Sequence, residues 1–341
     1  MKAEFGELQK LYGEIRLFPE NIDDIWHLSH LIAPGDLVFA TTLRTADTST
    51  DKIRPEKAEK RPVRLGIRVE KVEFHHYANR LRVTGLIEHG MEAGSYHTLN
   101  IETGYEISVI RQWRKSDLER IDRAVKASVY DVIHILTIEE GEAELFRIRH
   151  FGPELVITIT MGSGKGMEVN SRTSFFEKVL GQLSPVNGPL VVAGPGFIKE
   201  DFMKFFRARE SDKAAKMVVV ETRRTGAGAV QEVIGLGTLE KLAGDLQLAR
   251  EVNLMGEFLK RVSKGEPVAY GRAEVKNAAD CGAIEKILVV DTLIRDPDVV
   301  GLMEKAEQSD AGVIVFSTGF EPGKQLDALG GVAALLRYRI G

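Results

Sequence analysis

The sequence predicts a multidomain α/β protein of the α+β class, and three observations lead to this prediction. The chain has 341 residues, which is more than one ordinary hydrophobic core accommodates. Residues 1 to about 112 carry the alternation of half-buried strands, as in Val63, Leu65, Ile67 and Val69. Two later segments each alternate between strand and helix patterns. We therefore expect domains at residues 1–128, 129–260 and 261–341.

The first domain is expected to begin with a short helix that leads directly into strands. Apolar residues follow helical spacing from Ile22 to Trp26, and a Pro-Gly-Asp turn at 34–36 ends the helix before a strand that starts at Leu37. A lone helix ahead of a run of strands is typical of an Sm-like β-barrel. A capping box, Ser116 to Glu119, then predicts a connector helix to the next domain.

Acidic residues gather on the polar side of the first predicted helix, and two interpretations of them stay open. Negative charge in the first turn is favoured by the helix dipole whatever the function. Alternatively, carboxylate and imidazole groups could bind a divalent metal ion, whose bound hydroxide would cleave an RNA phosphodiester. In that divalent-metal-dependent endoribonuclease, the catalytic residues would be Glu20, Asp23 and Asp24, with His27 as a further metal ligand.

A long polar stretch between Arg44 and Pro62 predicts either a solvated hairpin tip or an arm that contacts nucleic-acid phosphate. Arg64 and Arg68 would extend the same positive charge along the following strand. A further cation, Lys165, lies in a glycine-rich loop of the second domain that fails the phosphate-loop pattern. The candidate RNA-binding residues are Arg44, Lys52, Arg54, Lys57, Lys60, Arg61, Arg64 and Lys165.

The second domain is expected to have three meandering strands followed by helix, strand, helix and strand. This order is typical of a ribonuclease-H-like layered domain. A stiff Gly-Pro-Gly turn precedes Phe197 at the end of one predicted strand. The Phe197 ring could fold back as a hydrophobic staple, or it could serve as an anchor for a protein partner. The candidate contact residues of this turn are Pro195, Gly196 and Phe197.

Composition narrows the functional class further. The net charge of −4 argues against general nucleic-acid coating but allows a local basic patch. One cysteine, Cys281, excludes an internal disulfide and suits a reducing compartment. The sequence shows no leader and no apolar run near the roughly 18 residues that a membrane helix needs. We therefore expect a cytoplasmic monomer without membrane contact.

Several blocks of the sequence resemble the archaeal Pelota family, which is related to class I release factors. The blocks are Gly13-Glu14, Asp23-Asp24-Ile25-Trp26-His27, Ala40 to Arg44, Gly194 to Phe197, and Leu329 to Tyr338. The resemblance implies an Sm-like first domain, a release-factor-like central domain and an L7Ae-like α/β sandwich at the C-terminus. Thr45, Gly319 and Phe320 depart from the family pattern.

The resemblance also implies a function on the ribosome. Members recognise stalled ribosomes by entering the A site with a translational GTPase resembling elongation factor one alpha. With a recycling ATPase they promote subunit dissociation in ribosome rescue and no-go mRNA decay, without a cofactor. The chain lacks the Gly-Gly-Gln tripeptide of release factors, so no peptide release is expected. An endoribonuclease activity has been ascribed to archaeal members, which keeps the metal-dependent alternative open.

Overall fold

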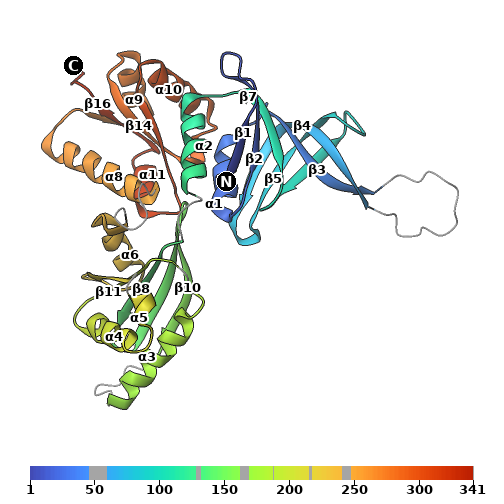
Figure 1. Ribbon diagram of the computed structural model, residues 1–341. Helices are drawn as coiled ribbons and strands as arrows, with labels where there is room; N and C mark the ends of the chain where they lie inside the picture. Colours follow the sequence, from blue (N-terminus) through green and yellow to red (C-terminus); the bar gives the residue numbers. More distant parts are fainter. Residues whose placement is uncertain are drawn as a thin grey trace. The chain divides into compact units, whose positions relative to one another are not determined.

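The computed structural model describes residues 1–45, 60–127, 132–161, 169–186, 188–214, 217–239 and 247–340. Within these ranges the strands form three sheets, and helices accompany each of them, as the multidomain α/β prediction requires (Figure 1). The chain divides into two compact units, Met1–Val129 and Tyr130–Gly341. The first unit holds one sheet and the second holds two. Lys52, Arg54, Lys57 and Lys165 lie outside the described residues.

The first unit is built on a seven-stranded sheet in the order β1-β2-β7-β3-β4-β5-β6. All neighbouring strands pair antiparallel, and the helices α1 (Ile22–Leu31) and α2 (Lys115–Ala127) accompany the sheet. The strands are β1 (Lys2–Phe5), β2 (Tyr12–Phe18), β3 (Leu37–Thr45), β4 (Lys60–His75), β5 (Arg80–His89), β6 (Tyr96–Ile101) and β7 (Ile107–Gln112).

The prediction that a helix opens this domain is wrong, because β1 and β2 precede α1. In the connection between them the positive φ angles fall on Lys10 and Leu11, at 51° and 66°, and not on a glycine or asparagine. Such angles are costly for residues with large side chains. The side-chain amide of Gln112 donates to Lys10 O at 2.7 Å, and the backbone N–H of Trp113 donates to Leu11 O at 2.8 Å. These donors come from the far end of the domain sequence and help to hold the turn.

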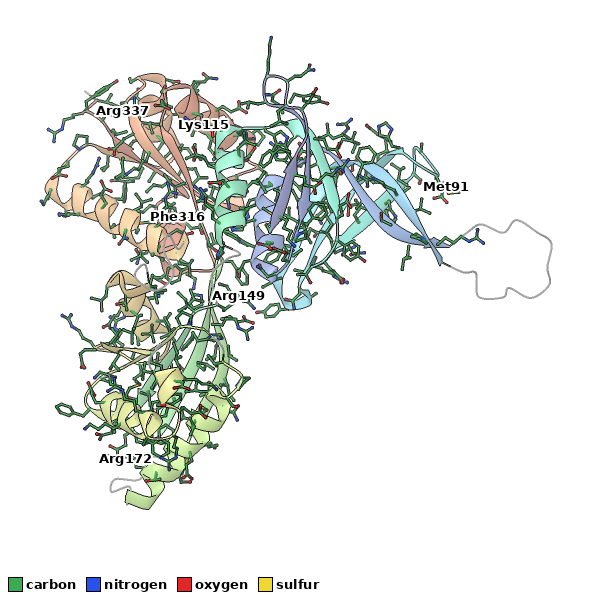
Figure 2. All side chains as sticks on the ribbon, viewed as in Figure 1. Met91, Lys115, Arg149, Arg172, Phe316 and Arg337 are labelled. Atoms are coloured by element: carbon green, nitrogen blue, oxygen red, sulfur yellow. The ribbon has the colours of Figure 1, made fainter. Side chains whose placement is uncertain are left out.

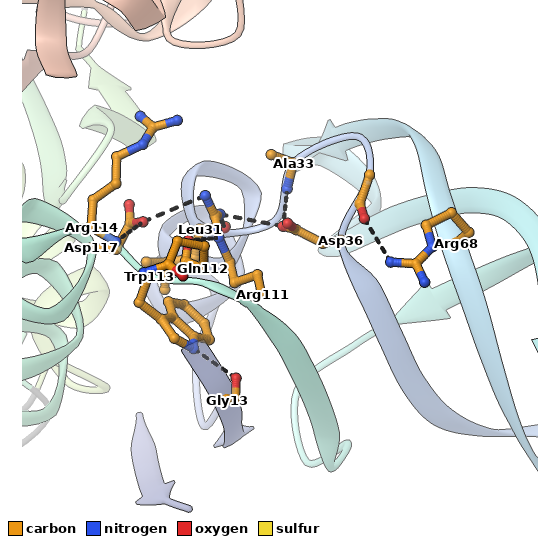
Figure 3. A network of polar contacts seen from close by, with 11 residues as sticks. Gly13, Leu31, Ala33, Asp36, Arg68, Arg111, Gln112, Trp113, Arg114 and Asp117 are labelled. Carbon is orange, nitrogen blue, oxygen red and sulfur yellow. Dashed lines mark hydrogen bonds and ion pairs between the residues drawn. The ribbon is translucent and has the colours of Figure 1, made fainter. Parts of the chain in front are cut away.

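Arg111 joins four elements of the first unit (Figure 3). Its guanidinium lies 3.3 Å from Asp36 and 3.6 Å from Asp117, and it donates to the carbonyl of Leu31 at the end of α1. Burial raises the pKa of Asp36, and the charge of Arg111 offsets part of that rise. Asp117 also accepts from the N–H of Arg114, so α2 starts at Lys115 and the predicted cap at Ser116 is wrong.

The central sheet of the second unit has the order β10-β9-β8-β11-β12. The strands β8 (His134–Glu139), β9 (Glu142–Arg149) and β10 (Gly152–Thr160) form an antiparallel meander, whereas β11 (Leu190–Gly194) pairs in parallel with β8 and with β12 (Met217–Glu221). Helices α3 (Val169–Leu183) and α4 (Ile198–Arg207) pack on one face of the sheet, and α6 (Gly226–Gly235) packs on the other. A short helix, α5 (Ser211–Ala214), precedes β12.

The last sheet has the order β13-β16-β14-β15. Helices α9 and α10 cover one face, and α8 and α11 cover the other. The final Leu-Ala-rich element of the sequence is the buried strand β16. The strands are β13 (Val268–Tyr270), β14 (Ile284–Val290), β15 (Gly312–Phe316) and β16 (Val332–Leu336), and the helices are α8 (Gln247–Lys264), α9 (Arg272–Asp280), α10 (Pro297–Gln308) and α11 (Glu321–Ala328).

The helix α8 contributes to two hydrophobic cores, and the predicted boundary between residues 260 and 261 falls inside it. Leu248 and Ala249 pack in the core of the central sheet, whereas Phe258 packs in that of the last sheet. Phe320, one of the residues that depart from the family pattern, is 2% exposed and also packs in the central core. An apolar packing role therefore explains this residue.

A buried histidine makes the stability of the second unit depend on pH. Burial, reinforced by the neighbouring charge of Arg147, lowers the pKa of His134 to about 4. Between that value and the usual pKa near 6.5, the unfolded chain binds a proton that the folded chain does not. Stability therefore falls as the pH drops through this window.

We expect His134→Gln to remove this acid sensitivity. Between pH 7.5 and 4.5 the wild type should lose about 2–3 kcal/mol more unfolding free energy than the variant, since one pKa unit corresponds to about 1.4 kcal/mol. Urea unfolding of both proteins at the two pH values measures the difference. Parallel pH dependence of the two proteins would contradict this role of His134.

Candidate functional site

The acidic residues at the start of α1 bind groups of the protein itself. Asn21 caps the helix, and the Asp24 carboxylate accepts from the N–H groups of Glu20 and Asn21 at 2.8 and 3.2 Å. The same carboxylate lies 2.8 Å from the amino group of Met1, and Glu20 lies 3.3 Å from that group. Hydrogen bonding from Lys2, followed by that from the Met1 amino group, lowers the pKa of Glu20.

These contacts bear on the metal hypothesis. The Met1 amino group is a cation shared by the Glu20 and Asp24 carboxylates, so a metal ion would have to displace it. Asp24 and His27 are only 2% and 3% exposed, although the sequence pattern suggested an open polar side. In the ranges that the structure describes, no three His, Cys, Asp or Glu side chains gather as a metal site. The geometry therefore offers the endoribonuclease hypothesis no support.

The described part of the basic arm is the base of the hairpin formed by β3 and β4. Arg44 pairs across the strands with Arg61, and Thr45 pairs with Lys60. Three of the candidate cations are thereby brought to one end of the sheet. Paired strands hold neighbouring backbones about 5 Å apart, so these three residues are close neighbours in the sheet.

The cations further along β4 are already engaged within the first unit. Arg64 donates to Ser108 Oγ at 2.9 Å and lies over the ring of Phe39, with its guanidinium carbon 6.0 Å from the ring centroid. Arg68 donates two hydrogen bonds to Glu88, at 2.9 and 2.7 Å, so its positive charge is paired with that carboxylate. The predicted extension of the basic surface along β4 is therefore limited.

The Gly-Pro-Gly turn presents Phe197 to solvent. The ring is 82% exposed, so the interpretation of Phe197 as a staple on α4 is wrong. Gly196 takes a φ of 66° after the end of β11, a backbone conformation that favours glycine. An exposed phenyl ring on a constrained turn is a suitable anchor for an apolar pocket in a protein partner.

A buried lysine holds this turn. Lys199 is only 1% exposed, and its ammonium donates to the carbonyl of Gly196 and forms ion pairs with Glu221, at the end of β12, and Glu200. Burial alone would lower the pKa of Lys199, but the hydrogen bonds from its ammonium to Glu221 and Glu200 raise the pKa above its usual value. One positive charge therefore ties the Phe197 turn to the neighbouring strand.

Arg172 has a similar role at the start of α3 (Figure 2). Its guanidinium lies 2.9 Å from Glu140 in the turn after β8 and 3.6 Å from Asp201 in α4. The two ion pairs connect α3 to the strand turn and to the helix that follows Phe197.

Sequence reasoning missed both Lys199 and Arg172. A signal for Lys199 was present, because a lysine in the first turn of a helix opposes the helix dipole and needs a specific partner. Its partner Glu221 lies far along the sequence, at the end of β12. Nothing local in the sequence identifies that pairing.

Replacing Lys199 should loosen the turn. In Lys199→Met the Gly196 carbonyl loses its donor, and we expect a loss of about 1–3 kcal/mol in unfolding free energy with faster amide exchange at residues 194–198. Lys204→Met is the matched control, because that side chain is 78% exposed on the same helix and should change stability by less than about 0.5 kcal/mol. Equal effects of the two variants on stability and exchange would refute the role of Lys199.

No helix in the described ranges is long and apolar enough to cross a membrane. This finding concerns helices alone.

Comparison with known proteins places these features in a family. A model of the Pelota N-terminal domain matches residues 1–125, and a model of eRF1 domain 3 matches residues 248–340. Pelota homologs from Methanoregula boonei and Methanosphaerula palustris are each 63% identical over 341 and 340 residues, with 100% of both chains covered. The crystal structure of the Thermoplasma acidophilum Pelota protein is 26% identical, covers 100% of both chains and has a TM-score of 0.78.

An archaeal translation termination factor shares the fold, with a TM-score of 0.51 at 18% identity over 94% of this chain and 99% of that one. The full-length identity to the two homologs goes beyond a shared fold. The chain belongs to the Pelota family.

Proposed function

We propose that the protein is a non-catalytic ribosome-rescue factor. It would recognise stalled ribosomes by entering the A site with a translational GTPase and would promote subunit dissociation without releasing the peptide. The observation that carries this proposal is identity of 63% along the whole chain to Pelota homologs, in a sequence without Gly-Gly-Gln. A recycling ATPase would act after the GTPase leaves.

Each part of the chain has a place in this proposal. The first unit, which we assign to the Sm-like class, would lie in the decoding region with the hairpin end of β3 and β4 toward the mRNA. Arg44, Lys60 and Arg61, which strand pairing brings together, support such a contact. The central sheet, with its antiparallel meander and parallel strands, supports a ribonuclease-H-like assignment. The last sheet would be the L7Ae-like sandwich.

The exposed Phe197 is the proposed contact for the GTPase, a protein resembling elongation factor one alpha. Its exposure of 82% and the constraint from Lys199 favour an anchor that is already in its binding conformation. A preorganised anchor binds more tightly because less conformational entropy is lost on association. Pro195 and Gly196 would set the direction of the ring.

The experiment is a splitting assay on purified stalled ribosomes with the GTPase and the ATPase supplied. We expect the protein to accelerate subunit separation over the ATPase alone, and Phe197→Ala to reduce the GTPase-dependent part at least about tenfold, as for a buried aromatic anchor. Leu155→Ala is the control, since Leu155 is an exposed apolar residue of the same unit.

The outcomes separate the parts of the proposal. Splitting no faster than with the ATPase alone would refute the rescue function. Normal splitting with Phe197→Ala would refute only the assigned GTPase contact. End-labelled mRNA in the same reaction should remain intact; cleavage that Asp24→Ala abolishes would favour the metal-dependent endoribonuclease instead.

A further inference from the structure

A groove of about 750 Å³ lies beside the Phe197 turn. It is formed where the parallel strands β11 and β12 end and where α6 begins, and its lining includes Pro195, Arg223, Arg224 and Leu236. Ligands of open α/β sheets commonly bind at the carboxyl ends of parallel strands, where the loops diverge. Phe197 and Lys199 do not line this groove, but Pro195 belongs both to the groove and to the turn that presents Phe197.

Two arginines give the groove its positive charge. Arg223 and Arg224 are both exposed, and among the described residues neither guanidinium has an ion pair or a hydrogen bond. Their backbone is fixed, because the Arg223 N–H donates to Glu232 and the Arg224 carbonyl accepts from Thr222 Oγ1, each at 2.8 Å. A side chain at Gly228 would lie 2.9 Å from the Arg224 stem, so the stem rests against α6.

The two carboxylates that line the groove are already engaged. Glu221 forms an ion pair with Lys199, and Glu232 accepts the hydrogen bond from the Arg223 backbone. The charged groups of the groove that have no hydrogen bond or ion pair among the described residues are therefore the two guanidinium groups. The fork geometry of a guanidinium matches a carboxylate, with which it can form two parallel hydrogen bonds.

The remaining wall of the groove is apolar. Leu236 is 61% exposed at the end of α6, and Pro195 contributes its ring from the turn after β11. A ligand that suits the groove therefore carries both negative charge and apolar side chains. A protein segment supplies both, whereas an RNA backbone supplies phosphates but no aliphatic side chain to pack on Leu236 and Pro195.

We propose that this groove binds an acidic segment of a protein partner. Carboxylates of the segment pair with Arg223 and Arg224, and an apolar side chain packs on Leu236 and Pro195. The proposal does not rest on the rescue function, and the groove shares only Pro195 with the turn that presents Phe197.

Fluorescence anisotropy with the full chain tests this site. The probe is a short labelled peptide of alternating Glu and Leu, and the comparison probes are the same peptide with Gln for Glu and an oligouridylate of equal length. We expect the acidic peptide to bind, its Kd to rise with salt, and Arg223→Glu with Arg224→Glu to weaken binding at least tenfold. Leu236→Ser should weaken it as well, while leaving the salt dependence unchanged.

A double variant elsewhere in the unit is the matched control. Arg207→Glu with Lys260→Glu makes the same change in net charge, and neither residue lines the groove. This control should bind the acidic peptide as the wild type does. Equal weakening by both double variants, equal affinity for the Gln peptide, or no binding of the acidic peptide would overturn the proposal. Arginine-dependent binding of the oligouridylate alone would also overturn it and would make the groove an RNA site.

Discussion

The buried ammonium of Lys199 is the interaction on which the functional end of the central sheet depends. It connects the turn after β11 to the end of β12 through Gly196 and Glu221. The exposed Phe197 lies on that turn, and the groove of Arg223 and Arg224 begins at the same strand ends. A lysine is rarely buried unless its charge is paired. Here the ion pairs with Glu221 and Glu200 offset the cost of burial, and the hydrogen bond to Gly196 holds the turn that presents Phe197.

Charged groups in the first unit are used in a comparable way. Asp24, Glu20 and the Met1 amino group close the start of α1, and Arg111 joins its end to Asp36 and Asp117. Groups that could have served catalysis are thereby committed to holding the helix in place. Breaking such buried pairs leaves an uncompensated charge, which costs more than the pairs contribute.

Periodicity and local motifs predicted most of the fold. Features that depend on contacts between residues far apart in the sequence could not be predicted. Alternation from Val63 to Val69 identified part of β4, and the alternating strand and helix patterns of the later segments correspond to the two mixed α/β sheets. The hairpin of β1 and β2 was missed because its turn uses Lys10 and Leu11, which carry no turn signature and rely on Gln112 and Trp113. At the candidate sites, an outward-facing Phe197 was one of the two interpretations that the turn residues allowed, and the structure shows the ring exposed. The burial of Asp24 and Lys199 could not be predicted from the sequence, because each side chain pairs with groups that only folding brings close.

The central claim is that the protein acts on the ribosome without chemistry on peptide or mRNA. The most direct test follows the ester bond of peptidyl-tRNA while stalled ribosomes separate into subunits in the presence of the protein, the GTPase and the ATPase. The account predicts that the subunits separate and that the large subunit retains intact peptidyl-tRNA. Hydrolysis of the ester at the rate of subunit separation would contradict it and would make the protein a release factor.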